Sequence, residues 1–397
     1  MKKLLYILAA FILTAGFLLS CGDGADGGGG DGGGGPLGDG GDGGGGPTVK
    51  TVSTYNGTNA AILSDGSLWT WGLNSHGSVG DGTTGSTSNR NKPVRIEGNW
   101  ESVSAGRFHT VAIKSDGTVW SWGWNIYGEV GDGTTTQRNS PVMIEGSYAS
   151  VYASYDATIA FKSDGSYCAW GENYKNRLGL NSAILQYHVP TASSTNNWDS
   201  ISMSVYHSLG IRNGGQLWTW GFGDSYELGY GNTLDQLTPT RLGTESNWAS
   251  VSAGTRYSAA IKTNGTLWTW GRSTYGELGD GAMSSTKQIP TQVGTDTNWA
   301  QVSARSYNIA AIKTNGDLWI WGRNDSGQLG IGTSGAGTDK TSPVQVPGKW
   351  KQVVVGGSHT LGIKSDGTLW AWGGNGSGQL GDGTYTSRNT PVKVIFN

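Results

Sequence analysis

From residue 48 to the end of the chain, hydrophobic and polar positions alternate in short runs separated by tight-turn letters. Residues 109–114 (HTVAIK) are followed by the turn letters SDG and then by a second run, residues 118–122 (TVWSW). A period of two is typical of strands, and Asp-Gly or Asn-Gly between two such runs predicts a hairpin. No segment shows a convincing helical period. The pattern therefore predicts an all-β chain.

The same order of runs returns about every fifty residues. Six units carry the marker W-x-W-G, and a seventh reads C-A-W-G, with Cys168 in the first tryptophan position. Each unit also holds an opening strand and a later Pro-led strand such as residues 93–96 (PVRI), which makes about four strands. Seven small sheets in a row, none able to bury its own faces, predict a seven-bladed β-propeller. The glycines that close the markers are Gly72, Gly123, Gly171, Gly221, Gly271, Gly322 and Gly373.

The full unit, G-x-x-H-T-x-A-I-K-S-D-G-T-L-W-x-W-G-x-N-x-x-G-Q-L-G-D-G-T, resembles the repeat of the regulator of chromosome condensation family. Residues 106–134 and 356–384 are examples. The resemblance covers all seven units and implies a seven-bladed propeller. The third unit departs from it with GLNS at 179–182, and the first has Thr58 in the histidine position.

Two stretches at opposite ends of the repeat region bear on how the ring closes. The chain ends on PVKVIF (391–396), and the first unit opens with VKTV (49–52). We expect these terminal strands to come together and close the ring, which removes an exposed sheet edge.

The beginning of the chain has the form of a targeting signal. Lys2 and Lys3 precede a long apolar run that ends on Leu-Leu-Ser-Cys, with Cys21 last. This resembles the lipobox of bacterial lipoproteins, which implies removal of residues 1–20 and attachment of fatty acyl chains such as palmitate to Cys21. Such chains would tether the protein to a membrane that it does not cross. An uncleaved membrane anchor and a plain secretory signal are the alternatives.

The segment after Cys21 is dominated by glycine and aspartate, cannot bury apolar surface and predicts a flexible linker. The expected parts are a signal peptide (1–20), a lipidated cysteine with its linker (21–47) and the propeller (48–397). By resemblance to lipoproteins, the protein is expected in a bacterial cell envelope. Gly22 after the cysteine favours the outer membrane, with the propeller either periplasmic or surface-exposed.

Composition and net charge argue against nucleic-acid binding. The chain has 69 Gly and 19 Trp and a formal net charge of −2. A nucleic-acid binder is expected to show a basic excess or stripe, and none is evident. Most tryptophans lie in the repeated markers, which is typical of packing between blades. Cys168 is therefore expected to be a buried, inert thiol.

The repeats offer no case for catalysis, for a metal or for a cofactor. His109, His207 and His359 occupy one repeat position, so we interpret them as hydrogen-bonding groups inside the blades. The aspartates of the recurring GDG letters are expected to form turns. The spacing of the remaining histidines matches no metal motif. The sequence therefore predicts a protein that is not an enzyme.

Gly376, Gly378 and Gly381 spell G-x-G-x-x-G, the pattern of a dinucleotide-binding turn. Such a turn joins a strand to a helix that holds the pyrophosphate, and no helix is predicted here. Other units read NIYGEVGDG and STYGELGDG at this place, without a counterpart of Gly376. We interpret the motif as a coincidence within the repeat.

A binding face is predicted from the order of strands. The loop before the histidine position and the loop after W-x-W-G must share one face of the ring, whereas the uniform SDG and TNG turns mark the other. The first two loops vary between units and carry aromatic and arginine side chains, which are typical of interaction hot spots. The candidate partner-binding residues are Arg107, Phe108, Trp124, Tyr155, Tyr206, Phe222, Arg256, Arg272, Tyr307 and Arg323.

Family members include a nuclear nucleotide-exchange factor, parts of ubiquitin ligases and a secreted bacterial propeller that inhibits β-lactamases. Fold does not choose among such roles, and the lipoprotein signal argues against the nuclear and ubiquitin roles. The leading hypothesis is a monomeric, membrane-tethered scaffold that binds a protein partner. The alternatives are an inhibitor of a secreted or periplasmic enzyme such as a β-lactamase, and a glycan or cell-wall binding module.

Overall fold

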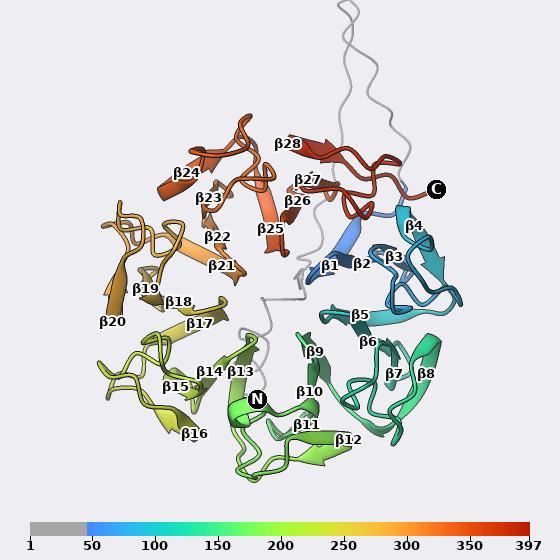
Figure 1. The fold of residues 1–397 in the computed structure, drawn as a ribbon, viewed down its shortest axis with the longest axis horizontal. Helices are drawn as coiled ribbons and strands as arrows, with labels where there is room; N and C mark the ends of the chain where they lie inside the picture. The colour runs from blue at the N-terminus through green and yellow to red at the C-terminus, as the bar shows by residue number, and fades with distance from the viewer. Residues whose placement is uncertain (1–45) are drawn as a thin grey trace, which may run out of the picture.

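The computed structural model describes residues 46–397, which form a ring of seven antiparallel sheets (Figure 1). Each sheet, or blade, contains four strands paired in chain order. The predicted all-β, seven-bladed propeller is confirmed. The predicted signal segment 1–20, the acylation site Cys21 and nearly all of the linker 21–47 lie outside the described residues.

The blades follow one another around the ring in chain order, and a short 3₁₀ turn, η2 (Tyr174–Asn176), is inserted in blade 3. Blade 1 contains β1 (Val49–Thr54), β2 (Thr58–Leu63), β3 (Leu68–Gly72) and β4 (Arg90–Ile96). Blade 2 contains β5 (Trp100–Ala105), β6 (His109–Lys114), β7 (Thr118–Gly123) and β8 (Arg138–Ser147). Blade 3 contains β9 (Ser150–Ser154), β10 (Ala157–Phe161), β11 (Tyr167–Glu172) and β12 (Gln186–Ala192).

The remaining four blades repeat this plan. Blade 4 contains β13 (Trp198–Met203), β14 (His207–Arg212), β15 (Gln216–Gly221) and β16 (Gln236–Arg241). Blade 5 contains β17 (Trp248–Ala253), β18 (Tyr257–Lys262), β19 (Leu267–Arg272) and β20 (Thr286–Gln292). Blade 6 contains β21 (Trp299–Arg305), β22 (Asn308–Lys313), β23 (Leu318–Gly322) and β24 (Lys340–Val346). Blade 7 contains β25 (Trp350–Val355), β26 (His359–Lys364), β27 (Leu369–Gly373) and β28 (Arg388–Lys393).

The first strand of each blade lies nearest the centre of the ring and the fourth lies at the rim (Figure 1). Burial follows this order. In blade 2, five of the six residues of β6 are buried, whereas β8 buries one of its ten. The middle strands are covered on both faces by the neighbouring blades, which explains their long apolar runs.

The SDG and TNG sequences form the tight turns between the second and third strands, as predicted. In blade 2, Asp116 Oδ1 accepts hydrogen bonds from the backbone N–H and the hydroxyl of Thr118, at 2.9 and 2.6 Å. Gly117 between them has a φ of +83°, which a side chain disfavours. The recurrence of SDG and TNG thus reflects one turn geometry.

The second tryptophan of each marker holds its blade to the preceding one. All seven are fully buried, and each indole Nε1 donates a hydrogen bond of 2.8–3.1 Å to a backbone carbonyl of the preceding blade. Blade 3 keeps this bond although Cys168 replaces its first tryptophan, because Trp170 is the donor there. The seven residues are Trp71, Trp122, Trp170, Trp220, Trp270, Trp321 and Trp372.

These indoles explain the regular spacing of a glycine within the repeats. A Cβ added at Gly80 would lie 2.5 Å from Trp122 Nε1, and one added at Gly381 would lie 2.8 Å from Trp71 Nε1. Gly376, by contrast, has nothing within 4 Å of an added Cβ. The last glycine of the apparent dinucleotide motif therefore serves blade packing, as its place in the repeat indicated.

The first tryptophan of the marker makes a different contact. Trp120 Nε1 donates to the Thr118 hydroxyl at 2.9 Å, and Lys114 Nζ lies 3.8 Å from the Trp120 ring centroid and 5.2 Å from that of Trp100. Blades 4, 5, 6 and 7 repeat this cation–π pairing with Arg212, Lys262, Lys313 and Lys364. Such a contact contributes about 0.5–1 kcal/mol at an exposed site.

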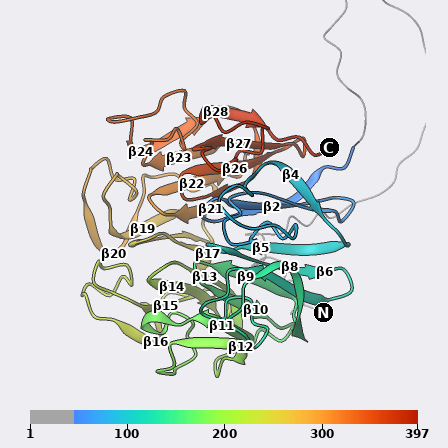
Figure 2. The same cartoon turned by 45° about the vertical axis from the view of Figure 1, so that its right-hand side comes forward.

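The ring closes where blade 7 meets blade 1. β1 and β28 belong to different sheets, so closure within the described residues uses packing between blades and not a shared strand. Val49 N–H donates to the Gly367 carbonyl at 2.9 Å, and the Phe396 ring lies 5.7 Å from Trp69. In both views the C-terminus lies beside blade 1 (Figures 1 and 2). The ends of the propeller thus come together as expected, but β1 and β28 do not pair, so their meeting does not remove a sheet edge.

Cys168 is buried and is a free thiol within the described residues. It packs in a hydrophobic cluster that includes Trp170 and Tyr148. Its position agrees with the prediction of a buried thiol in a tryptophan position.

Candidate functional site

The two variable loops of each blade lie on one face of the ring, which we name the top face. In all seven blades the residue after the marker glycine donates its N–H to a carbonyl of the loop between the first and second strands, over 2.7–3.0 Å. Trp124 N–H to the Phe108 carbonyl and Phe222 N–H to the Tyr206 carbonyl are two examples. The strand order therefore placed these loops correctly.

Four of the ten predicted residues meet in a first aromatic cluster, formed by Arg107, Phe108, Trp124, Tyr155 and His76. The His76 ring lies 4.7 Å from Phe108 and 4.1 Å from Trp124. The Arg107 guanidinium lies 4.7 Å from the Phe108 ring and 4.6 Å from the Tyr155 ring, and it donates to the Tyr155 hydroxyl at 2.9 Å. Burial and the charge of Arg107 lower the pKa of His76, which favours its neutral form in this cluster.

Three more predicted residues form a second aromatic cluster with Lys175. The rings of Tyr206 and Phe222 are in contact, with their centroids 5.8 Å apart and their planes tilted by 40°. Arg256 lies 5.0 Å from the Tyr206 ring, and Lys175 lies 5.1 Å from the Phe222 ring. Arg256 also pairs with Asp224 at 3.0 Å. Blades 3, 4 and 5 contribute to this cluster.

A third aromatic cluster joins Tyr307, Arg323 and Tyr275. The two tyrosine rings lie 5.1 Å apart, and the Arg323 guanidinium lies 5.1 Å from Tyr275 and 5.8 Å from Tyr307. Arg272 joins none of the three clusters. It is exposed at the end of β19, and among the described residues its side chain makes no ion pair or ring contact.

The central part of the top face contains two residues that the sequence analysis missed. Tyr55 and Arg305 occupy the first position of the G-x-x-H letters, where the other five blades have Gly or Ser. The Arg305 guanidinium lies 3.8 Å from the Tyr55 ring centroid and donates to the Tyr152 hydroxyl at 3.4 Å. The signal was present in the sequence, since two bulky residues interrupt a position that is otherwise small.

Tyr55 and Arg305 have room because the residue three positions later, in the histidine position, is small in both blades. A Cβ at Gly106 would lie 2.2 Å from His109 Cε1, so a large ring in the histidine position favours a small residue three positions earlier. The blades of Tyr55 and Arg305 have the smaller Thr58 and Asn308 in that position. The substitutions thus occur as compatible pairs.

Tyr55 and Arg305 line the mouth of the central channel, which we name the channel mouth. It has a volume of about 120 Å³, and Arg107, Tyr155 and Ser204 also line it. A second cavity of about 110 Å³ lies between the first strands and is lined by Tyr152, Arg305 and several serines.

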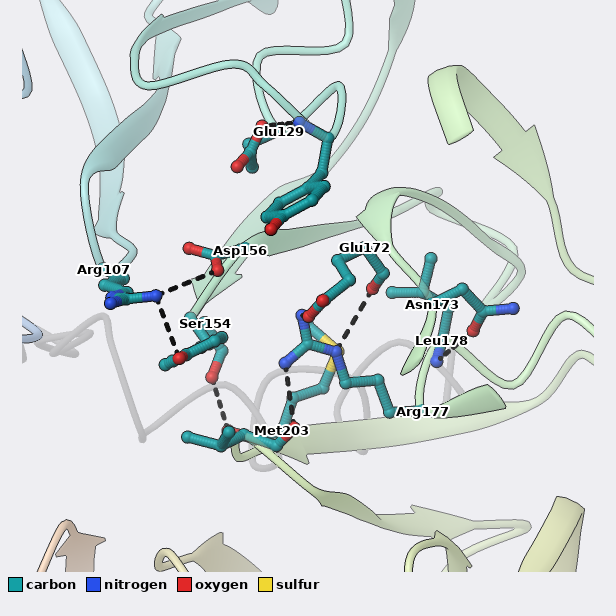
Figure 3. A network of polar contacts seen from close by, with 12 residues as sticks. Arg107, Glu129, Ser154, Asp156, Glu172, Asn173, Arg177, Leu178 and Met203 are labelled. Atoms are coloured by element: carbon teal, nitrogen blue, oxygen red, sulfur yellow. Dashed lines mark hydrogen bonds and ion pairs between the residues drawn. The ribbon is translucent and has the colours of Figure 1, made fainter. Parts of the chain in front are cut away.

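A polar network under the first and second clusters is built on a buried arginine (Figure 3). Arg177 is fully buried, pairs with Glu172 at 3.0 Å and donates to the carbonyls of Ser204 and Val205. Asp156 lies nearby and contacts Arg107 at 3.4 Å. Burial raises the pKa of Asp156, and the two arginines act against that shift.

Three buried glutamates occupy the position of Arg177 in other blades: Glu129, Glu227 and Glu277. Burial raises the pKa of Glu129 and Glu227 to about 7 and also raises that of Glu277. Glu129 Oε2 accepts the N–H of Tyr127, and in blade 6 Gln328 Oε1 accepts the N–H of Ser326 in the same way. Because the Gln328 amide makes the same hydrogen bond, we interpret the three glutamates as structural residues.

The three repeat-position histidines connect neighbouring blades. His109 Nε2 lies 3.0 Å from Thr158 Oγ1, His207 Nε2 lies 2.8 Å from Ser258 Oγ, and each partner belongs to the next blade. The interpretation of these histidines as groups inside the blades was wrong in this respect. Complete burial lowers the pKa of both to about 3 and that of His359 to about 4, which keeps the imidazoles neutral.

The recurring aspartates form turns, as predicted. Asp132 Oδ1 accepts hydrogen bonds from the N–H and hydroxyl of Thr134, and its other oxygen pairs with Arg138 at 2.6 Å. Within residues 46–397, no group of three His, Cys, Asp or Glu side chains is placed to hold a metal ion. Over the same residues, no helix is long and apolar enough to cross a membrane.

Known proteins share parts of this sequence. Protein RCC2 homolog of Danio rerio is 38% identical over 91 residues, which are 22% of this chain and 18% of that protein. Ultraviolet-B receptor UVR8 of Arabidopsis thaliana is 39% identical over 100 residues, which are 24% of this chain and 22% of the receptor. The matches thus span less than a quarter of either relative.

Solved structures share the fold over a greater length. Prp20p from Saccharomyces cerevisiae superposes with a TM-score of 0.73 at 19% identity, covering 86% of this chain and 88% of Prp20p. Human WBSCR16 superposes with a TM-score of 0.73 at 18% identity, covering 83% and 94%.

Family models identify the repeats themselves. A model described as the regulator of chromosome condensation (RCC1) repeat matches residues 65–113, 116–160, 214–261, 264–312, 315–363 and 366–397. A second model of the same description matches residues 49–78, 100–129, 248–277, 299–328 and 350–379. The matches cover most of the chain and leave the end of blade 3 and the beginning of blade 4 unmatched. The chain therefore belongs to the RCC1-repeat family.

Proposed function

We propose that the protein is a membrane-tethered binding scaffold outside the cytoplasm that engages a protein partner through the top face of its propeller. The observation that carries the proposal is the gathering of nine of the ten predicted residues into three clusters of aromatic and cationic side chains on that face. Tyrosine, tryptophan and arginine are the residue types enriched in interface hot spots.

The state of these side chains supports binding over a purely structural role. Phe108, Tyr206 and Tyr307 are half-buried, so their positions are set by neighbours before any partner arrives. Preorganised side chains lose less conformational entropy on binding than free ones. The loops that carry them stand on a rigid ring, which is the usual arrangement of binding loops.

A protein fits the clusters better than a glycan does. Sugar stacking requires an open aromatic face, whereas cations already occupy positions over Phe108, Tyr206 and Phe222. A protein partner can contact ring edges and the remaining hydrogen-bond donors of the arginines. Prp20p, which shares the fold, was characterised for its binding to Gsp1p and histones, and Kap60 was solved bound to it.

The support for membrane tethering comes from the sequence alone. The signal and the Leu-Leu-Ser-Cys letters ending at Cys21 support lipid attachment, and the glycine-rich linker would display the propeller away from the membrane. Mass spectrometry of the protein purified from membranes tests this part. We expect a mature N-terminus at Cys21 that carries acyl chains, and an unmodified Cys21 would contradict it.

The binding face is tested by cross-linking the full-length protein in envelope membranes and identifying the proteins recovered with it. The test variant combines Phe108→Ala, Tyr206→Ala and Tyr307→Ala, one residue from each cluster. Ile289→Ala is the control, because Ile289 is an exposed hydrophobic residue on the outer strand β20, away from the top-face loops. Thermal unfolding of all variants shows whether the fold is kept.

We expect the control to recover the same partner as the wild type and the triple variant to lose it. Equal recovery by the triple variant would contradict the top-face proposal. If the captured partner is an enzyme, for example a β-lactamase, assay of its activity with added propeller separates inhibition from scaffolding. Retention on peptidoglycan without any protein partner would favour glycan binding.

A further inference from the structure

Arg305 differs from the other half-buried or buried arginines of the top face in having no carboxylate partner. Arg107, Arg177, Arg256 and Arg323 each lie within 3.4 Å of an aspartate or glutamate oxygen. Among residues 46–397, Arg305 makes no ion pair, and its guanidinium donates only the long hydrogen bond to Tyr152. One permanent cation therefore stands in the channel mouth without a counter-charge.

The surroundings of Arg305 make this charge costly and also hold it in place. A guanidinium has five N–H donors, and most of those of Arg305 have no acceptor among the described residues. Partial removal of a charge from water is unfavourable unless the charge is paired. The Tyr55 ring at 3.8 Å offsets part of this cost through a cation–π contact.

The neighbours of Arg305 in the channel mouth are suited to an anion. Arg107 adds a second guanidinium, whose charge is balanced by Asp156 at 3.4 Å and which donates to the Tyr155 hydroxyl. The Tyr152 hydroxyl, which accepts from Arg305, lines the neighbouring cavity between the first strands. Arginine recognises a carboxylate through two parallel hydrogen bonds, and these bonds strengthen where water is excluded. The volume of about 120 Å³ suits a side chain rather than a strand or helix.

We propose that the channel mouth receives the carboxylate of an aspartate or glutamate side chain that projects from a loop of the protein partner, with Arg305 as its main ligand. The proposal rests on the proposed function, since it specifies what the partner presents to the top face. The three aromatic clusters would then contact the flanks of the same loop. Tyr55 and Tyr152 act as positioning residues for the Arg305 guanidinium.

Phage-displayed random loops closed by a disulfide provide a probe that does not require the partner to be identified first. The loops are selected on the full-length protein, and the best binders are synthesised with their acidic residue and with the corresponding amide. Affinities are measured for the wild type, Arg305→Gln, Arg305→Lys and Arg95→Ala. Arg95 is the matched control because it is an exposed arginine on the outer strand β4.

We expect selected loops to share an acidic residue, and its change to the amide to weaken binding to the wild type about tenfold or more. In Arg305→Gln the acid and the amide should bind alike, and Arg305→Lys should recover part of the preference. Arg95→Ala should behave as the wild type. Inorganic phosphate should displace the loop only at much higher concentration than the loop itself.

Selected loops without an acidic residue, or an acid preference that persists in Arg305→Gln, would overturn the proposal. Failure to select any binder, or displacement by phosphate at the concentration of the loop, would overturn it as well. The outcome is separable from that of the proposed function. If the triple variant loses the partner but Arg305→Gln keeps it, the proposed function stands and the carboxylate site is refuted. If selected loops require their acidic residue but no envelope protein is recovered, the carboxylate site stands and the proposed function is refuted.

Discussion

Trp71 Nε1 donates a hydrogen bond of 3.1 Å to the backbone carbonyl of Gln379, across 308 residues of sequence. The same bond joins every other pair of neighbouring blades, for example Trp220 to the Arg177 carbonyl at 2.8 Å. The ring is thus closed by a contact of the kind that builds it. This closure holds blade 1 beside blade 7, and Tyr55 of blade 1 meets Arg305 of blade 6 at the centre of the top face.

Trp71→Phe should destabilise the propeller about as much as Trp220→Phe. Phenylalanine keeps much of the apolar contact but removes one of the two donors to each carbonyl, since Asn59 Nδ2 still donates to Gln379 and the Ser208 hydroxyl to Arg177. The loss of one such hydrogen bond costs about 1 kcal/mol. Denaturant unfolding measures the free energy of unfolding of both variants. A loss below about 0.5 kcal/mol for Trp71→Phe, with a normal loss for Trp220→Phe, would show that the ring closes by other contacts.

Gly381→Ala and Gly376→Ala should differ sharply although both lie in the G-x-G-x-x-G letters. Gly381 has a φ of +66°, and an added Cβ would meet Trp71 Nε1 at 2.8 Å. Strain and overpacking of this kind cost about 2 kcal/mol or more. Gly376→Ala should change the free energy of unfolding by less than about 0.5 kcal/mol, because nothing lies within 4 Å. Similar losses for the two variants would refute the packing role of Gly381.

Glu129→Gln combined with Glu227→Gln should stabilise the protein at pH 8 and have less effect at pH 5. The folded pKa of each glutamate is raised to about 7, so each contributes a destabilisation that grows as pH rises from the unfolded value through 7. By linkage, a shift of this size corresponds to up to about 3 kcal/mol per residue at pH 8. Unfolding curves at the two pH values measure the difference, and a variant that is less stable than the wild type at pH 8 would contradict this view.

The blade-bridging histidines should produce the opposite pH dependence. Their folded pKa values of about 3 to 4 lie below the ordinary value of 6.5, so the unfolded chain binds more protons below pH 6.5. Stability is therefore complete above pH 6.5 and is lost progressively as pH falls toward 4. The expected loss between pH 7 and 5 is about 2 kcal/mol per histidine.

This histidine effect is best measured in the Glu129→Gln, Glu227→Gln background, because the glutamates oppose it over the same range. In that background NMR should show His109, His207 and His359 without titration between pH 8 and 5. Protonation of any of the three near pH 6.5 in the folded protein would contradict their burial as neutral bridges.

Much of the fold was predictable because each blade repeats one solution to one packing problem. The alternating runs, the SDG turns and the W-x-W-G markers identify strands and their order, and the order alone places the loops of Phe108 and Trp124 on one face. The prediction was less reliable where contacts join different repeats. Whether His109 bonds within its blade or to Thr158 of the next depends on how blades stack, which a single repeat does not encode.

The contact between the central residues of the candidate site was likewise not predictable from a single repeat. Tyr55 and Arg305 belong to blades that are not neighbours, and they meet only because the ring brings all first strands to one axis. Their unusual size in a Gly or Ser position was visible in the sequence. The pairing between them required the closed ring, as did the separation of the predicted residues into three clusters.

Site-specific photo-cross-linking in cells tests whether the top face engages a protein partner. A benzophenone amino acid replaces Tyr206 on the top face, Thr263 in a turn on the opposite face, or Thr238 on the outer strand β16, each in the full-length protein. We expect irradiation to join a defined partner to the protein labelled at position 206 and not to the other two. A partner cross-linked from position 263 or 238 with a yield equal to or above that from position 206 would show that the partner does not bind through the top face.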